Sequence, residues 1–226
     1  MKKTVYTLPF LLSLGLVYAQ SENVKRLEEA ATVFDEVMSI SDKAIPQALL
    51  DKSECAIVVP GLKKGAFIIG GKFGRGFVSC RKKGGAGWSA PAAVRVEGGS
   101  FGLQIGGAET DVIMLVMNPR GVGRLLSSKF TLGGDASVAA GPVGRTATAE
   151  TDASMMAEIL TWSRTRGVFA GVSLQGATLR QDLGVNRELY GRTLENKEIV
   201  TTDISVPQTA SKLIGLLNKH SGRKGR

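Results

Sequence analysis

The sequence contains one histidine (His220), two cysteines and few aromatic residues. A structural zinc site usually needs four Cys, His or carboxylate ligands, and two cysteines with one distant histidine do not supply them. Aromatic residues make up 6% of the chain, whereas proteins that bind single-stranded nucleic acid place aromatic side chains among basic ones. We therefore expect no metal, no cofactor and no nucleic-acid partner.

The motifs that resemble catalytic ones are incomplete. Residues 98–102 fit the G-x-S-x-G pattern of a serine hydrolase, but that serine needs a strand before it, a helix after it and a histidine to activate it. Residues 71–78 resemble a glycine-rich nucleotide loop, yet Phe73 follows Lys72 where a Walker motif has Ser or Thr. We expect a protein that is not an enzyme, with Ser100 in a turn.

The first 19 residues have the order of a secretory signal peptide. Lys2 and Lys3 precede an apolar stretch over 5–17, and Ala19 ends a suitable cleavage site. The stretch is shorter than the roughly 20 residues that span a bilayer. We expect residues 1–19 to be removed and the protein to be exported, either periplasmic or secreted, free or peripheral on a membrane.

Basic residues outnumber acidic ones, 29 to 20, which gives a formal net charge of +9. Cleavage after Ala19 would leave 207 residues, enough for one domain, and a charge of +7. A basic protein outside the cytoplasm can meet anionic lipid head groups or polyanionic glycans. An ordinary solvated surface would have the same composition.

Cys55 and Cys80 both lie in apolar, strand-like segments. Export would permit a disulfide between them. Buried free thiols are equally natural at such positions, so both alternatives stay open.

Residues 22–39 predict an amphipathic helix within an N-terminal segment, 20–40. Its apolar residues recur at spacings of three and four and form one seam: Val24, Leu27, Ala31, Phe34 and Met38. The rest of its surface is largely acidic and would be repelled by anionic lipid. We expect the seam to pack against the domain or against a second copy, and the second case would make this a self-associating structural protein of the cell envelope.

Short apolar segments separated by glycines dominate the middle of the chain, and helices are expected at 22–39, after Pro46, at 119–127, at 186–190 and at 206–218. Glycine inside a strand indicates a bulge, a bend or a close backbone approach. The pattern predicts an α+β fold with a curved, mainly antiparallel sheet or partial barrel and with N-terminal, inserted and C-terminal helices. Residues 41–219 would form one domain, followed by a basic disordered tail at 220–226.

Loop lysines and arginines are natural contacts for phosphate groups. Seven lie in or beside one glycine-rich hairpin and are our candidates for head-group contact: Lys63, Lys64, Lys72, Arg75, Arg81, Lys82 and Lys83.

Several segments together resemble the SYLF domain family. They are GWSAPAAVRV (87–96), SFGLQIGGAETDVIMLVMN (100–118), ASVAAGPVGR (136–145), SRTRGVFAGVSLQG (163–176), ELYG (188–191) and, upstream, the segment 45–76. The resemblance covers most of 40–220 and implies a lipid-binding module; eukaryotic members associate with phosphoinositide membranes and fungal ones with actin.

The sequence departs from that setting in its secretory signal, in the absence of an appended Src-homology or zinc-finger module, and in the acidic face of its first helix. From these departures we expect actin not to be a partner. The resemblance still implies binding of anionic phospholipid or a phosphoinositide-like head group at a membrane surface, or of a lipid-like molecule in a pocket lined by the sheet.

Overall fold

The computed structural model describes residues 21–40, 44–66, 69–82, 84, 86–101, 106–143, 157–165, 168–169 and 174–222. Its helices are α1 (Glu22–Ser39), α2 (Gln47–Lys52), α3 (Pro119–Leu125), α5 (Leu183–Tyr190), α6 (Asn196–Thr201) and α7 (Ser211–Ser221), with a 3₁₀ turn η1 (Gln208–Ala210). The expected signal peptide, 1–19, lies outside the described residues.

In the described part of the chain, nine strands form one curled sheet. They are β1 (Cys55–Ala66), β2 (Ile69–Cys80), β3 (Ala92–Phe101), β4 (Gly106–Val116), β5 (Lys129–Thr131), β6 (Val138–Ala140), β7 (Ile159–Thr165), β8 (Val168–Phe169) and β9 (Thr178–Gln181). The order is β5-β9-β3-β2-β1-β4-β7-β6, with β8 paired to β7. Only the β6–β7 pairing is parallel among those described. The predicted α+β fold is confirmed.

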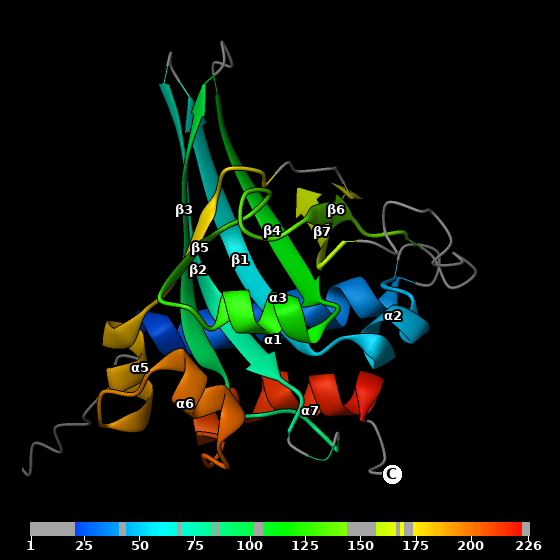
Figure 1. Ribbon diagram of the computed structural model, residues 1–226, viewed down its shortest axis with the longest axis vertical. Helices are drawn as coiled ribbons and strands as arrows, with labels where there is room; N and C mark the ends of the chain where they lie inside the picture. The colour runs from blue at the N-terminus through cyan, green and yellow to red at the C-terminus, as the bar shows by residue number, and fades with distance from the viewer. Residues whose placement is uncertain are drawn as a thin grey trace, which may run out of the picture.

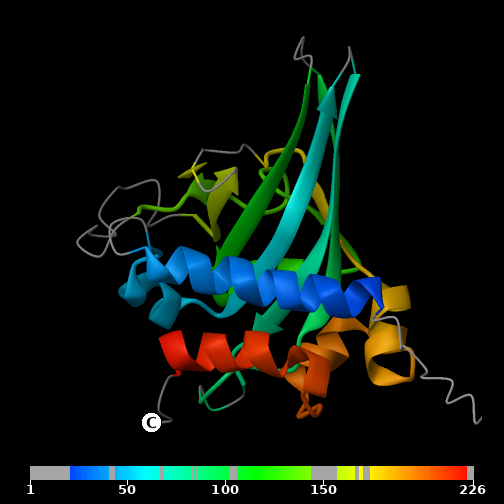
Figure 2. The same cartoon turned by 180° about the vertical axis from the view of Figure 1, so that it is seen from behind.

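Two apolar layers enclose the lower half of the sheet. One lies under α1, α2 and α7 and contains Leu27, Phe34 and Leu213; α1 and α7 run side by side across this face (Figure 2). The other lies under β5, α3 and α6 on the opposite face (Figure 1) and contains Val59 and Phe130. The strands β1–β4 continue well beyond the helices, so one end of the sheet projects from the body.

Helix α1 matches its expected bounds because its sequence supplies both a cap and a seam. The Ser21 side chain accepts a hydrogen bond from the backbone N–H of Val24 at the first turn. Leu27 and Phe34 are almost completely buried against this chain's own sheet and α7. The seam therefore packs within the chain, which is the first of the two alternatives that its pattern left open.

Two further expectations need correction. Helix α7 extends through Ser221, so His220 belongs to a helix and its ring contacts Phe34 edge-on rather than lying in a disordered tail; residues 223–226 lie outside the described part. Ser100 lies within strand β3 instead of in a turn. No helix of the described residues is long and apolar enough to span a membrane.

A bulge in β1 determines where its side chains point. The register of β1 with β4 shifts between Val59 and Leu62, and Gly61 has a φ of 57° there. Opposite the bulge, a Cβ on Gly76 would lie 2.1 Å from the carbonyl oxygen of Val58. Glycine is required at both positions, as expected of glycines that allow sheet curvature and close approach.

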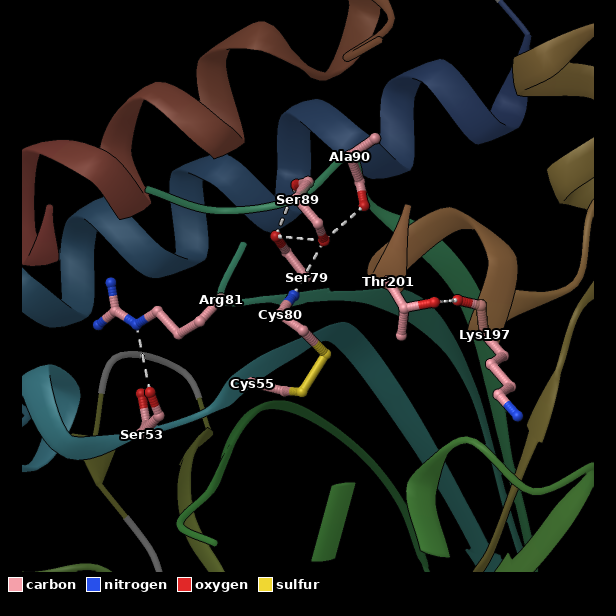
Figure 3. Close-up of a disulfide and its surroundings, with 9 residues drawn as sticks. All are labelled: Ser53, Cys55, Ser79, Cys80, Arg81, Ser89, Ala90, Lys197 and Thr201. Carbon is pink, nitrogen blue, oxygen red and sulfur yellow. Dashed lines mark hydrogen bonds between the residues drawn. A yellow bond between two sulfur atoms is a disulfide. The ribbon is translucent and has the colours of Figure 1, made fainter. Parts of the chain in front are cut away.

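Cys55 and Cys80 form a disulfide between directly opposed residues of β1 and β2 (Figure 3). Of the two alternatives left open by the sequence, the structure contains the bridge. It joins residues 25 apart at the base of the first hairpin, where both cysteines are buried. Because the cross-link restricts the unfolded chain, it favours the folded state.

We expect Cys55→Ala/Cys80→Ala to lower the free energy of unfolding by roughly 3 kcal/mol, the chain-entropy value for a loop of this size. Urea unfolding of the variant and the wild type, with and without reductant, measures this. The reduced wild type should approach the variant, and the variant should not respond to reductant. A wild type equally stable in its reduced form would contradict the prediction.

Candidate lipid-binding surface

The seven candidate residues do not form one cluster. Lys63, Lys64 and Lys72 lie on the projecting half of the β1–β2 hairpin, whereas Arg81 and Lys82 follow the other end of β2. Lys72 and Arg81 are nine residue steps apart along an extended strand, which is about 30 Å at about 3.3 Å per residue. Lys83 lies outside the described residues. The hairpin therefore carries basic residues at both of its ends.

Lys64 and Lys72 are directly opposite each other in the β1–β2 pairing. The neighbours that continue this row across the sheet are Ala108 on β4 and Gly98 on β3. The four positions thus contain two positive charges and no acidic side chain. Like charges directly opposite in a sheet repel each other, so the opposition of Lys64 and Lys72 is electrostatically unfavourable.

The β1 bulge places this pair on the face away from α1. Val59 and Leu62 both belong to the apolar layer on that face, although strict alternation would put residues three apart on opposite sides. Lys64, two residues beyond Leu62, therefore shares its face. Lys63 points to the α1 side instead.

The environment lowers the pKa of both ammonium groups. Partial burial lowers the pKa of Lys64, and the charge of Lys72 lowers it further. Burial also lowers the pKa of Lys72. Loss of water around the ammonium group is the first cause in both cases, because it disfavours the protonated form. An anion bound between them would reverse this effect.

An open groove of about 1360 Å³ lies on the other face, between α1 and the projecting strands. Its lining carries charges of both signs, among them Glu29 of α1, Lys63 of β1 and Glu109 of β4. Arg164 crosses one end, paired with Glu36 at 2.5 Å and Asp111 at 3.1 Å. An acyl chain there would have to displace water from ionised groups, so this groove does not suit a buried lipid tail.

Arg75 lies on the α1 side of β2, away from the lysine pair. Its Nε is 3.3 Å from a carboxylate oxygen of Asp182, the N-cap residue of α5. It is directly opposite Arg95, which in turn is opposite Arg180. Sequence reasoning missed Arg95 and Arg180; the alternation Val94-Arg95-Val96 marks an outward side chain, but only the strand register brings the arginines together.

Arg81 is buried, with 8% of its surface exposed, and it holds the C-terminal helix. Its guanidinium donates hydrogen bonds to the carbonyl oxygens of Ser53 (3.2 Å, Figure 3), Leu50 (2.9 Å) and Ser221, and to the Ser221 hydroxyl. It also lies 3.9 Å from the centre of the Trp88 ring. Arg81 is therefore not a head-group contact, and its assignment as one was wrong.

Lys82, by contrast, is partly exposed and pairs with Asp203 at 3.1 Å near the helical end of the molecule. This location separates it from the lysine pair. No group of three or more metal-ligating side chains lies close together in the residues that the structure describes.

Arg81→Met should lower the free energy of unfolding by about 3 kcal/mol, because buried carbonyl groups lose their donors. Lys82→Met is the matched control, since it removes the same charge one residue later from an exposed ion pair and should cost less than about 1 kcal/mol. Urea unfolding compares the two. Equal losses would show that Arg81 does not anchor α7.

Comparison with known proteins gives a consistent result. The model of the family described as "Ysc84: Las17-binding protein actin regulator" matches residues 97–220. An SH3 domain-containing protein of Schizosaccharomyces pombe is 35% identical over 181 residues, 79% of this chain and 42% of that protein. Protein YSC84 of Saccharomyces cerevisiae is 33% identical over 185 residues, 80% and 39% of the two chains.

The SH3 domain-containing YSC84-like protein 1 of Xenopus laevis is 32% identical over 197 residues, 84% of this chain and 58% of that protein. The chain thus spans between 39% and 58% of the length of these relatives.

Proposed function

The chain belongs to the Ysc84 family, the SYLF domain that its sequence resembles, and from this membership we propose that it is a non-enzymatic module that binds anionic phospholipid head groups at a membrane surface. The relatives are named as binding and regulatory proteins. The observation that carries the proposal is the opposed pair Lys64 and Lys72 at the projecting end of the sheet.

A phosphate group would resolve the electrostatic cost of this pair. Two ammonium groups held opposite each other repel, and partial burial strengthens the repulsion. Phosphate oxygens can accept hydrogen bonds from both and turn the repulsion into attraction. The lysine pair therefore suits the binding of an anion better than it suits the stability of the sheet.

The position of the pair supports a membrane surface as the source of that anion. The strands β1–β4 project beyond the helices on both faces (Figures 1 and 2), so this end can approach a lipid surface without the helices intervening. Lys63, exposed on the same stretch of β1, points to the other face, where it lies opposite Glu109. The net charge of +7 that remains without residues 1–19 favours the same approach to an anionic surface.

We carry export forward as part of this proposal. It rests on the order of charged, apolar and small residues in 1–19. The membrane would then be one that faces the periplasm or the cell exterior, and the lipid an abundant anionic phospholipid or a similar phosphorylated head group. Secretion of a fusion of residues 1–30 to a reporter enzyme tests the export signal independently of lipid binding.

Actin regulation is the second candidate function, because the description of the family model names it for other members. This finding weighs against the expectation that actin is not a partner. Co-sedimentation of the chain with filamentous actin tests it. Binding to filaments in the absence of vesicles would make actin the better supported function, whereas flotation with vesicles and no co-sedimentation would favour lipid.

Lys64→Gln/Lys72→Gln should weaken binding to vesicles of phosphatidylglycerol and phosphatidylcholine by roughly tenfold to thirtyfold, at about 1 kcal/mol for each lysine near an anionic surface. Flotation at increasing salt measures it, and wild-type binding should fall as salt screens the charges. Lys197→Gln/Lys212→Gln is the control, because it removes two exposed lysines from the helical end. Equal losses in both variants would contradict a site at Lys64 and Lys72.

The same lysine variant should be slightly more stable than the wild type at neutral pH, by about 0.5 kcal/mol or less for partly solvated charges. The pKa values of both lysines lie below the unfolded value of 10.5 in the folded protein. As pH rises towards 10.5, the folded wild type therefore loses protons that the unfolded wild type still holds. Where this happens, the free energy of unfolding of the wild type rises relative to that of the variant. Urea unfolding across this range checks it. A constant difference would show that the two charges do not destabilise the fold.

A further inference from the structure

A second basic surface lies on the α1 side of the sheet and contains neither Lys64 nor Lys72. Of the seven residues expected to contact head groups, it includes only Arg75. Arg75 on β2, Arg95 on β3, Arg180 on β9 and Lys129 on β5 are opposed in successive strand pairs and form one straight row. We call these four residues the arginine row. With about 4.8 Å between neighbouring strands, the row is about 14 Å long.

The carboxylates nearby neutralise the arginine row only in part. Arg95 and Arg180 share one carboxylate, Glu97, at 3.4 and 3.6 Å from their Nε atoms. Arg75 has Asp182 at 3.3 Å from its Nε. Four positive charges therefore face two negative ones.

The outer guanidinium nitrogens of the three arginines remain available. Each arginine approaches its carboxylate through Nε, and those Nε atoms do not reach hydrogen-bonding geometry. Among the residues that the structure describes, none forms a hydrogen bond with the Nη atoms of these three arginines. The side chains are 37–40% exposed, so three planar donor groups face solvent side by side. Planar forks of this kind bind carboxylate and similar oxyanions through two hydrogen bonds.

An exposed aromatic ring lies beside this row. Phe73 is 48% exposed, and its ring centre is 5.8 Å from the guanidinium carbon of Arg75. Phe73 is also directly opposite Glu97, which places it in the adjacent row of the same face. The apolar C–H face of a sugar ring packs well on such a ring, while a charged substituent of the sugar can reach the guanidinium groups.

From this combination we propose that the arginine row and Phe73 bind a linear acidic polysaccharide, with sugar carboxylates on successive arginines. The row favours a chain over a membrane because α1 and α5 cover the lower part of the same face (Figure 2). A flat lipid surface would meet these helices, whereas a single polymer chain can lie along the row. Among the side chains that the structure describes, Phe73 is the one large aromatic that is exposed, and a single ring does not make the base-stacking platform of a single-stranded nucleic-acid site.

The test is a calorimetric titration of the full-length protein with oligogalacturonate, a polysaccharide fragment that has one carboxylate on each sugar unit. Uncharged dextran is the control ligand. Arg95→Lys/Arg180→Lys keeps the charge and removes the forks, and should weaken binding about tenfold, the loss expected for one charge-assisted hydrogen bond of about 1.4 kcal/mol. Glu97→Gln removes the competing carboxylate and should strengthen binding. Lys64→Gln/Lys72→Gln, on the opposite face, should leave it unchanged.

Thermal unfolding checks that each variant is folded. If Arg95→Lys/Arg180→Lys does not fold, the gain in affinity expected for Glu97→Gln still tests the proposal. Equal losses of oligogalacturonate affinity in the arginine and lysine variants would overturn the proposal. An unchanged affinity in Glu97→Gln would also overturn it. Binding of oligothymidylate tighter than that of oligogalacturonate would also overturn it and assign the row to nucleic acid. Loss of vesicle flotation in the arginine variant, with sugar binding unchanged, would assign the row to the membrane instead.

Discussion

The alternation of side chains along β1, and its interruption at Gly61, decides where charge is placed on this fold. A strand sends successive side chains to opposite faces, and one inserted residue inverts every position after it. Before the bulge, Ala56 and Val58 pack under α1; after it, Lys63 takes that side and Lys64 faces away. Without the inversion Lys64 would face the acidic residues of α1, and Lys64 and Lys72 would no longer share a face.

Most elements could be predicted from local pattern. The apolar seam of residues 22–39 predicted α1 with the bounds that the structure shows. Asn118-Pro119 predicted the start of α3, which the Asn118 side chain caps. Helix α6 was missed because its six residues show too little periodicity. The fold class followed from the grouping of helices around glycine-punctuated strands.

The site was less predictable because it depends on strand register. Proximity along the sequence suggested that Lys72 and Arg81 were neighbours, whereas an extended strand carries them to opposite ends of the molecule. Nothing in the sequence near Arg180 indicates Arg95 as its partner. Strand β9 begins 77 residues after the end of β3, and only the folded sheet places the two strands side by side. The burial of Arg81 likewise depends on Ser221, 140 residues away.

The attachment of α7 through Arg81 has a consequence for the order of folding. Arg81 and Trp88 belong to the first half of the chain, yet they donate to Ser221 in the last helix, at separations of 140 and 133 residues. Contacts this distant form late, because closing a long loop must precede them. During synthesis the apolar surface of α1 would stay uncovered on the α7 side until the C-terminal residues emerge, so the nascent chain exposes hydrophobic surface for nearly the whole of its translation.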